Sequence, residues 1–424
     1  MKRASFALAL LALAACGAAT GDRVNPEVPG WVSRPSGDLH LIFRRALTID
    51  GRKSGEEYEH GKPEIDPTNA RVFVGSSDRG LYALRAFGGS TLWRFETTGM
   101  VQCEPLFDRE LDVVYFGSND GALYAVKASD GTLIWRFNSG SEVSKKPVVS
   151  GETLYFTNAS DQLFAVDRRT GASRWQAHRT SALGMEVGGH SGPTLDHGKV
   201  YVAYSDGHVT AYDARDGGER WDVDLSADAE QTGGAEAQRY LDVDTTPIVA
   251  DLPDVGRVVY AASYAGGIMA LDAENGLRIW ANVQAKGVHE LVLWMEPAHT
   301  PHPKGPDKGG PAVPAQRILF GASSSTGLWA LSPKDGRPIW RLPVPEGGIT
   351  APVPVAGAIV LGTTRYGMFL LSPRDGSVID AFNLESGFAA TPAAYGTRVF
   401  ALTSGGTFLG LGIDAPLGRR DGKP

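Results

Sequence analysis

The amino-acid sequence predicts an all-β protein, an eight-bladed β-propeller whose ring is closed by strands from both ends of the domain. Glycine and proline account for 53 and 26 of the 424 residues, and both residue types disfavour helix interiors. Short runs of β-branched and aromatic residues recur in repeats of about 40 to 60 residues, a spacing typical of one four-stranded blade per repeat. Hydrophobic residues make up 42% of the sequence, which excludes a disordered chain.

Each repeat ends in a tryptophan at a fixed distance from a glycine and an alanine. In the first repeat Gly89 lies four residues before Trp93, and Ala83 lies six residues before Gly89. The tryptophans of the following repeats are Trp135, Trp175, Trp221, Trp280 and Trp340, and a seventh repeat has Asp380 in this position. We expect the small alanine on a central strand to let the neighbouring sheet approach. The tryptophan then offers a large apolar surface to the next blade.

Dipeptides containing glycine predict tight turns within each blade. Asp120-Gly121, Asp206-Gly207 and Gly266-Gly267 lie between successive apolar runs. Such pairs supply the positive φ angles that two-residue hairpin turns need. A second pair, such as Asp130-Gly131, includes the glycine that precedes the tryptophan. Each repeat is therefore expected to fold as strands joined by turns in one four-stranded sheet.

Incomplete repeats at the two ends predict how the ring closes. Residues 398–411 follow the repeat pattern without a tryptophan strand after them, and residues 39–48 form a strand with no blade before it. Joined together, the two pieces complete one blade and remove the open edges of the ring. We therefore expect a single propeller domain over residues 38–414 and a C-terminal tail over 415–424. A ring of seven blades is the alternative.

The N-terminal residues resemble a bacterial lipoprotein signal. Met1-Lys2-Arg3 is basic, and the apolar run from Ala4 to Ala15 is too short to span a bilayer. The run ends in Leu13-Ala14-Ala15-Cys16, which matches a lipobox. We expect a signal peptide over residues 1–15, and an ordinary secretory signal is the alternative.

The lipobox implies lipidation of Cys16 and a lipidated tether over residues 16–37. Several acyl chains would hold the protein firmly at a membrane surface. Gly17 follows the cysteine, and in lipoproteins of this kind that residue favours sorting to the outer membrane. The expected location is therefore the periplasmic face of the outer membrane, with a lipid anchor.

Charge and cysteine content exclude other classes of function. The formal net charge of −7 argues against a nucleic-acid-binding role, because such a role requires an excess of positive charge. Two cysteines close at most one disulfide. Because Cys16 is expected to carry lipid, Cys103 is expected to be an unpaired, buried hydrophobic residue. The sequence has neither a phosphate-binding loop nor a dinucleotide-binding glycine motif.

A long connection over residues 283–316 contains side chains of the types that bind metals, namely His289, Glu290, Glu296, His299 and His302. No histidine pair has the spacing of ligands on a helix, and the prolines preclude a helix. We therefore expect a solvated loop and no metal site. The apolar stretch 291–294 makes this loop a secondary candidate for contact with a partner.

The repeats resemble those of the quinoprotein dehydrogenases, propellers of the pyrroloquinoline-quinone (PQQ) type. Enzymes and non-catalytic proteins share this PQQ-like repeat, so the fold does not decide the function. Among the enzymes, the resemblance implies a larger chain, an acidic Ca²⁺ site with a catalytic aspartate, and a vicinal disulfide. Cys16 and Cys103 cannot form that disulfide because they are not adjacent. We expect no enzyme activity and no cofactor; a PQQ-dependent dehydrogenase and a propeller binding a glycan or another envelope ligand are the alternatives.

The lipobox, the tether and the eight blades together resemble the BamB family, lipoproteins of the outer-membrane β-barrel assembly machinery. The most specific likeness lies in two interblade connections, Met185–Pro193 and Arg239–Pro247. The resemblance implies a non-catalytic scaffold whose interblade loops bind a periplasmic domain of the central barrel-inserting subunit. Unfolded outer-membrane proteins, pairing with an exposed strand edge, are a further expected partner.

The same resemblance assigns roles to individual residues. It makes Met185 and Val187 apolar anchors, and Asp242 and Asp244 acidic contacts. Gly188 stands where the family has an arginine, which is a departure from the family's pattern. Turn capping is the alternative role of the two aspartates, because aspartate side chains readily satisfy local backbone donors.

Overall fold

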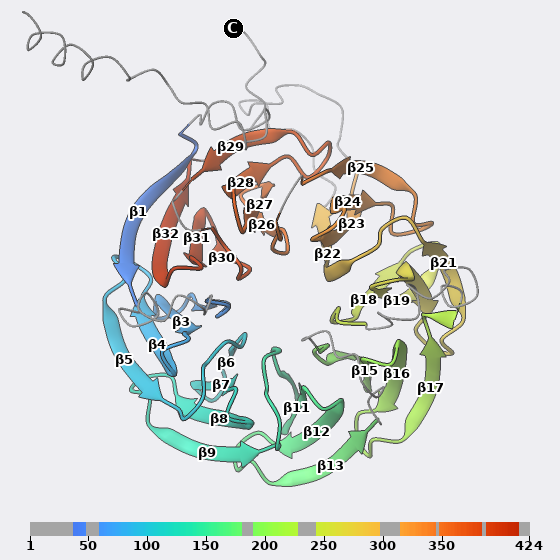
Figure 1. Ribbon diagram of the computed structural model, residues 1–424. Coiled ribbons are helices and arrows are strands. Elements are labelled where there is room, and N and C mark those ends of the chain that lie inside the picture. Colours follow the sequence, from blue (N-terminus) through green and yellow to red (C-terminus); the bar gives the residue numbers. More distant parts are fainter. Residues whose placement is uncertain are drawn as a thin grey trace, which may run out of the picture. The chain divides into compact units, whose positions relative to one another are not determined.

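The computed structural model describes residues 37–47, 59–179, 190–227, 243–296, 314–344, 347–383 and 387–414. Within these ranges 32 strands form eight four-stranded antiparallel sheets, which surround a central axis as the blades of a propeller (Figure 1). The predicted fold class is confirmed, with eight blades and not seven. The described residues all belong to one compact unit, Arg34–Pro424. None of them forms a helix that could cross a membrane.

Each blade runs from an inner strand at the axis to an outer strand at the rim. Blades 1 to 4 consist of β2 (Glu64–Asp66), β3 (Arg71–Gly75), β4 (Gly80–Arg85), β5 (Thr91–Glu96); β6 (Leu106–Asp108), β7 (Val113–Gly117), β8 (Ala122–Lys127), β9 (Leu133–Asn138); β10 (Val148–Ser150), β11 (Thr153–Asn158), β12 (Gln162–Asp167), β13 (Ser173–His178); and β14 (Thr194–Asp196), β15 (Lys199–Ala203), β16 (His208–Asp213), β17 (Glu219–Asp224). Blades 5 to 8 consist of β18 (Ile248–Leu252), β19 (Gly256–Ser263), β20 (Gly267–Asp272), β21 (Arg278–Asn282); β22 (Val288–Glu296), β23 (Gln316–Ser323), β24 (Gly327–Leu331), β25 (Pro338–Leu342); β26 (Val353–Val355), β27 (Ala358–Thr363), β28 (Gly367–Leu371), β29 (Val378–Phe382); and β30 (Ala393–Tyr395), β31 (Arg398–Leu402), β32 (Thr407–Ile413), β1 (Leu39–Ala46).

Strand β1 closes the ring as the outer strand of blade 8. It pairs antiparallel with β32, from Leu39 opposite Ile413 to Ala46 opposite Thr407. The ring closure predicted from the two incomplete repeats is therefore confirmed. A register shift between Leu41 and Phe43 places Phe43 opposite Gly410. Phe43 therefore stands at the position of the outer strand that tryptophan occupies in most other blades.

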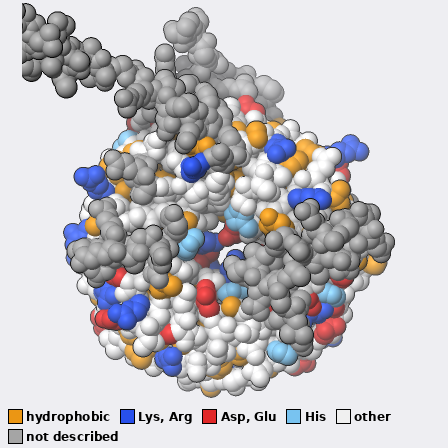
Figure 2. Space-filling model, in the orientation of Figure 1, with side chains coloured by type: hydrophobic (Ala, Val, Ile, Leu, Met, Phe, Trp, Pro, Cys, Tyr) orange, Lys and Arg blue, Asp and Glu red, His pale blue; other side chains and the backbone are white. Residues whose placement is uncertain are grey.

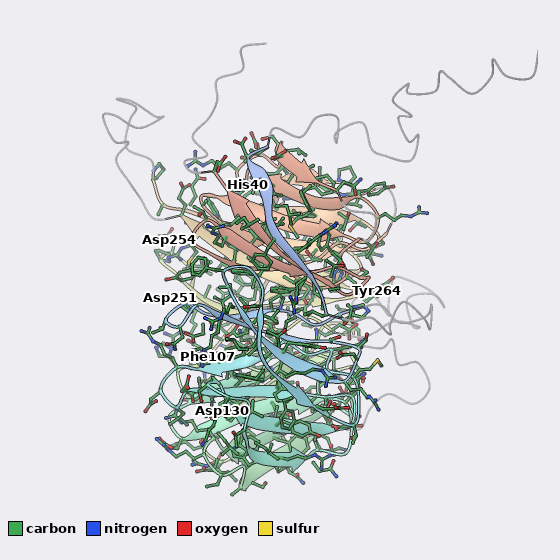
Figure 3. The ribbon with its side chains drawn as sticks, turned by 90° about the vertical axis from the view of Figure 1, so that its left-hand side faces the viewer. His40, Phe107, Asp130, Asp251, Asp254 and Tyr264 are labelled. Carbon is green, nitrogen blue, oxygen red and sulfur yellow. The ribbon has the colours of Figure 1, made fainter. Side chains whose placement is uncertain are left out.

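The order of strands gives the ring two different faces. Four antiparallel strands reverse direction three times, so each inner strand begins on the same face on which the previous outer strand ends. We call this the interblade-loop face, and the opposite one the hairpin face. Tyr264, in the turn between the two central strands of blade 5, lies on the interblade-loop face. Asp130 and Asp254, in turns that join a central strand to an outer or an inner strand, lie on the hairpin face (Figure 3).

Each tryptophan of the repeat joins its blade to the next one. The Trp135 indole N–H donates to the Arg168 carbonyl of blade 3 at 3.1 Å, and the Tyr115 hydroxyl donates to the same oxygen at 2.8 Å. A Cβ atom on Gly171, in the same turn, would lie 2.8 Å from the Trp135 ring. The other tryptophan–glycine pairs are Trp93 with Gly131, Trp175 with Gly217, Trp221 with Gly276, Trp280 with Gly336 and Trp340 with Gly376. Ala125 is fully buried opposite Trp135, which confirms the predicted packing role of the alanine.

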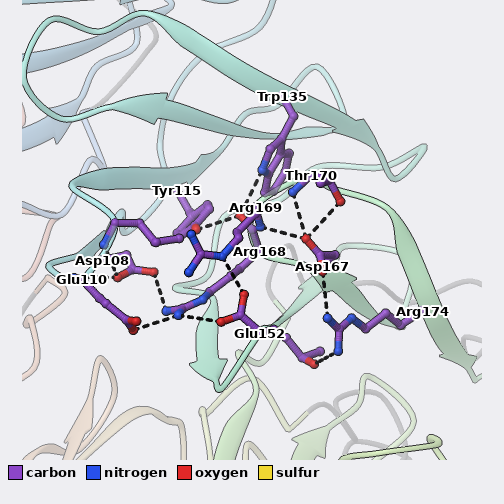
Figure 4. Close-up of polar contacts among 12 residues, drawn as sticks. Asp108, Glu110, Tyr115, Trp135, Glu152, Asp167, Arg168, Arg169, Thr170 and Arg174 are labelled. Carbon is purple, nitrogen blue, oxygen red and sulfur yellow. Dashed lines mark hydrogen bonds and ion pairs between the residues drawn. The ribbon is translucent and has the colours of Figure 1, made fainter.

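Ion pairs on the hairpin face add a second link between blades. The Arg168 guanidinium lies 3.0 Å from Asp108 and 2.8 Å from Glu110, both in blade 2, and 3.2 Å from Glu152 of blade 3 (Figure 4). Arg168 and Asp108 are both buried. Arg168 therefore links blade 3 to blade 2 twice, through its backbone carbonyl oxygen and through its guanidinium.

Blade 7 meets blade 8 through Asp380 instead of a tryptophan. The Asp380 carboxylate is buried, and its two oxygens accept the backbone N–H groups of Leu39 at 2.7 Å and Ala381 at 2.8 Å. Hydrogen bonds from backbone donors offset the cost of burying this charge. The aspartate in the tryptophan position therefore anchors the first residue of the closing strand β1.

Cys103 lies in the apolar contact between blades 1 and 2, where it is fully buried and unpaired. Burial raises the pKa of its thiol to about 12. The prediction of a buried hydrophobic cysteine is confirmed.

Candidate functional site

One of the predicted site residues can be placed in the structure. Asp244 precedes inner strand β18 on the interblade-loop face. Cys16, Met185, Val187 and Asp242 lie outside the described residues, as do the predicted signal peptide and C-terminal tail. Their assignments stay predictions.

The stems of the two candidate loops lie side by side. The backbone N–H of Gly192, at the end of the first loop, donates to Thr246 Oγ1 of the second at 3.0 Å. The Thr194 hydroxyl donates to the Pro247 carbonyl. A Cβ atom on Gly192 would come within 2.9 Å of the Thr246 hydroxyl, so this contact requires glycine. The structure therefore brings together the ends of two connections that the sequence places about 50 residues apart.

The Asp244 carboxyl is mostly enclosed beside these stems. Its Oδ1 atom is buried and has no hydrogen-bond partner among the described residues. Burial raises the pKa of Asp244, and the nearby Lys145 ammonium opposes that shift. No donor of the described residues reaches Oδ1, and the choice between turn capping and partner contact stays a prediction. An enclosed acceptor without a partner is energetically costly and favours any ligand that brings a donor.

A layer of ion pairs crosses the axis of the ring. The Lys62 ammonium of blade 1 lies 2.6 Å from Glu290 of blade 6 and 3.6 Å from Glu104 of blade 2. The Lys146 ammonium of blade 3 lies 2.7 Å from Glu64 of blade 1 and 3.5 Å from Glu104. Since Lys62 and Glu290 belong to blades that are not neighbours, their side chains meet at the axis.

Mutual attraction keeps the cross-axis pair charged. Burial by itself would raise the pKa of Glu290, but the Lys62 ammonium, followed by Lys145, outweighs it and lowers the pKa to about 2. Burial by itself would lower the pKa of Lys62, but Glu290 and Glu104 raise it above its usual value. Both side chains are therefore ionised at neutral pH, and each leaves a buried charge if the other is removed.

A second group of polar residues lies nearer to the interblade-loop face. Burial, followed by the Lys145 charge, lowers the pKa of His190 to about 3. Burial also lowers the pKa of His289, whose Nε2–H donates to the Ile349 carbonyl at 2.8 Å. Both imidazoles are therefore neutral at neutral pH. Lys145 places its ammonium 3.5 Å from the main-chain oxygen of Asp244.

The expectation of a solvated loop over residues 283–316 is wrong in part. Residues 288–296 form the inner strand β22, and Trp294 is 5% exposed. Glu290 binds Lys62, and Glu296 binds Arg374 at 2.8 Å. Residues 297–313, with His299 and His302, lie outside the described residues.

The axial charges have a signal in the sequence that is separate from the tryptophan, glycine and alanine positions of the repeat. Lys62, Glu104 and Lys146 each stand directly before a proline at the start of an inner strand. This shared position in successive repeats predicts that the three side chains face one another at the axis. Blade 6 has Glu290 followed by leucine, so the same signal does not find that member of the network.

Comparison with known proteins supports one family. A family model described as "Outer membrane protein assembly factor BamB" matches residues 110–341 and 292–421. The two matches overlap and together span well over half of the chain. The chain belongs to the BamB family.

Curated BamB proteins are about one quarter identical to this chain over the residues that align. The protein from Yersinia pestis is 26% identical over 346 residues, which cover 81% of this chain and 69% of the relative. The protein from Legionella pneumophila (strain Paris) is 25% identical over 224 residues, which cover 53% of this chain and 50% of the relative. The chain therefore spans about half to two thirds of the length of these relatives. All of them are named outer membrane protein assembly factors.

Solved structures support the fold. The crystal structure of BamB from Moraxella catarrhalis matches with a TM-score of 0.67 at 20% identity, covering 88% of this chain and 99% of that one. A quinohemoprotein alcohol dehydrogenase from Pseudomonas putida HK5 matches with a TM-score of 0.66 at 13% identity, covering 92% of this chain and 78% of that one. Such low identities show that the architecture is shared and nothing further.

The axial residues of this BamB-family chain do not fit the Ca²⁺ site that supports the quinone in such dehydrogenases. Glu64, Glu104 and Glu290 each bind a lysine ammonium, and a cation would have to displace it. Across the described residues, no three His, Cys, Asp or Glu side chains are arranged to hold a metal ion. Together with the missing vicinal cysteines, these contacts do not match a quinone site.

Proposed function

We propose that the chain is a non-catalytic scaffold lipoprotein of the outer-membrane β-barrel assembly machinery. Its interblade loops bind the periplasmic domain of the central barrel-inserting subunit. Membership of the BamB family and the names of the curated relatives support the assembly role. The observation that carries the binding site is the hydrogen-bonded pair of loop stems, which aligns the two candidate connections on one face.

Asp244 gives this surface a defined chemical preference. Its carboxyl is enclosed and has an oxygen without a donor, so a lysine or arginine of the partner would satisfy it. We assign Asp242 the same acidic role, and Met185 and Val187 the role of apolar anchors at the centre of the contact. In interfaces of this kind a few buried anchors carry most of the binding energy.

The rigid ring lowers the cost of binding. The stems are fixed by hydrogen bonds between neighbouring blades, so less conformational entropy is lost when a partner docks. Lipidation of Cys16 would keep the ring at the periplasmic face of the outer membrane, where the assembly subunit lies. The outer strands also expose apolar side chains at the rim, such as Leu133 and Ile134, which would suit an unfolded outer-membrane protein pairing with a strand edge.

Affinity purification of the acylated full-length chain from solubilised outer membranes tests the proposal. We expect the central barrel-assembly subunit in the eluate, and a large loss of that subunit with Asp242→Arg combined with Asp244→Arg. The matched control is Asp254→Arg, because Asp254 is an exposed aspartate on the hairpin face. Absence of the subunit from the wild-type eluate would refute the proposed function. Equal recovery from the double variant and the control would refute the assigned contact residues.

A further inference from the structure

The interblade-loop face is hollowed at its centre, and basic, acidic and histidine side chains gather around the hollow (Figure 2). We propose that this hollow binds a small oxyanion, a carboxylate or a phosphate, through the Lys145 ammonium and the flanking imidazoles of His190 and His289. The site lies at the axis of the ring and does not depend on the proposed contact with the assembly subunit.

Lys145 reaches the axis from blade 3. Its ammonium lies 3.5 Å from the main-chain oxygen of Asp244, which leads into blade 5. Its charge also acts on His190 of blade 4 and on His289 of blade 6. Blade 6 is three blades away around a ring of eight. A side chain that interacts with all of these blades must extend over the axis and not toward the rim.

Lys145 differs from the two deeper axial lysines because it forms no close ion pair with any carboxylate of the described residues. Lys62 and Lys146 have carboxylate oxygens at 2.6 Å and 2.7 Å. No carboxylate among the described residues lies within the 4.0 Å ion-pair distance of the Lys145 ammonium. An ammonium carries three N–H donors, and here the acceptor within reach is a backbone oxygen at the long distance of 3.5 Å. The group is therefore free to take an anionic acceptor, which forms the stronger, charge-assisted hydrogen bond.

His190 and His289 complete the donor set. His190 is buried, with Nε2 3.5 Å from the Ser144 hydroxyl, and His289 is oriented by its hydrogen bond to Ile349. The single N–H of neutral His289 is donated to Ile349, so this imidazole donates to a bound anion through Nδ1 once a proton is added there. An anion placed between the two imidazoles would favour their protonated forms. Of the charged groups that face the imidazoles, the Lys145 and Lys62 ammonium groups oppose protonation and the Glu290 carboxylate favours it.

The carboxylates around the hollow do not favour a cation instead. Glu64, Glu104 and Glu290 lie in the deeper layer, where each of the three carboxylates binds Lys62, Lys146 or both. Asp244 is the neighbour that opposes an anion. Its carboxylate would repel a bound anion, so removal of the Asp244 charge should strengthen anion binding, in contrast to its proposed role toward a basic partner.

Calorimetric titration of the acylated full-length chain in neutral detergent, at constant ionic strength, tests the proposal with inorganic phosphate and with malonate as probes. We expect at least one of them to bind with a Kd on the order of millimolar. Lys145→Gln should weaken binding by about tenfold or more, because one charge-assisted contact is lost. Asp244→Asn should tighten binding severalfold. Proton–nitrogen spectra of histidine-labelled protein should show the ring signals of His190 and His289 shifting with the titration.

The matched control is Lys199→Gln, which removes a partly buried lysine paired with Glu274 away from the axis. It should bind the probe as the wild type does, and Lys145→Arg should retain most of the affinity. If Lys145→Gln lowers the melting temperature, His190→Gln provides an independent loss of affinity. Failure of both probes to bind the wild type overturns the proposal, as does unchanged affinity in Lys145→Gln. Neither result depends on whether the assembly subunit co-purifies.

Discussion

The indole ring of Trp135 occupies the space in front of Gly171, the turn glycine of the next blade. A Cβ atom on Gly171 would lie 2.8 Å from two ring carbons, and Gly171 has a φ angle of +71°. The indole N–H donates to Arg168, three residues earlier in the same turn. The same contact recurs at the other tryptophan-bearing junctions. The fixed spacing of glycine and tryptophan along the chain therefore reflects contact between successive blades.

Gly171→Ala should destabilise the ring by about 2–4 kcal/mol, since it adds a left-handed backbone penalty to a steric clash with the indole. Urea unfolding followed by tryptophan fluorescence measures this change. Gly151→Ala is the matched control, because Gly151 also has a positive φ, +54°, but nothing lies within 4 Å of its missing Cβ. The control should lose about 1–2 kcal/mol. Equal losses would show that the indole contact adds nothing.

Arg168 is buried, whereas the adjacent Arg169 is exposed. Substitution of each arginine in turn should therefore compare how much a buried and an exposed ion pair stabilise the fold. Arg168→Met leaves the buried carboxylate of Asp108 without its partner and should cost about 3–5 kcal/mol. Arg169→Met removes an exposed pair with Glu152 and should change the stability little, because solvent screens exposed ion pairs. Thermal unfolding of both variants checks the difference. Similar melting temperatures would mean that the Arg168 network does not hold blades 2 and 3 together.

The blades could be predicted from the sequence because their determinants are periodic. Trp135, Gly131 and Ala125 recur at the same relative positions in other repeats, and each position has the same packing task in every blade. Closure of the ring could also be predicted, because the two incomplete repeats add up to one. Strand β22 was missed because blade 6 lacks the proline that opens the other inner strands and carries polar residues at its start.

Other contacts of the candidate site join residues that do not occupy equivalent positions in the repeats. Lys62 and Glu290 are 228 residues apart and belong to different blades, so no local pattern relates them. Lys145 and His190 come together where blades 3 and 4 pack side by side, and the two residues do not occupy equivalent positions in their repeats. The role of Asp380 was equally hidden, because the backbone donor that it binds belongs to Leu39 at the other end of the domain.

Asp380→Ala should loosen the closing strand β1 before it affects the rest of the ring. The substitution leaves the Leu39 N–H buried without an acceptor, which should cost about 1–3 kcal/mol. Hydrogen exchange of the amides of Leu39–Ala46 should therefore become faster, while exchange in blades 2 to 4 stays unchanged. Asp130→Ala is the control, since Asp130 accepts a local hydrogen bond in an exposed turn. Unchanged exchange in β1 would show that Asp380 does not anchor the strand.

The cross-axis pair should make stability depend on acidic pH. The pKa of Glu290 is about 2 in the folded chain and about 4.3 when unfolded. Its contribution is therefore fully present above about pH 4.3 and is lost as the pH falls toward 2. Glu290→Gln should cost about 3–5 kcal/mol at pH 7, because it leaves the Lys62 ammonium buried beside weaker partners.

Urea midpoints measured between pH 7 and pH 3 check this dependence. The difference between the wild type and Glu290→Gln should shrink as the pH falls, because protonation removes the same charge from the wild type. Lys62→Met combined with Glu290→Leu should recover part of the loss at pH 7, since no uncompensated charge remains at that contact. Glu274→Gln, which removes an exposed partner of Lys199, should differ little from the wild type at any of these pH values. A difference between the wild type and Glu290→Gln that stays constant with pH would mean that the Glu290 charge does not stabilise the axis.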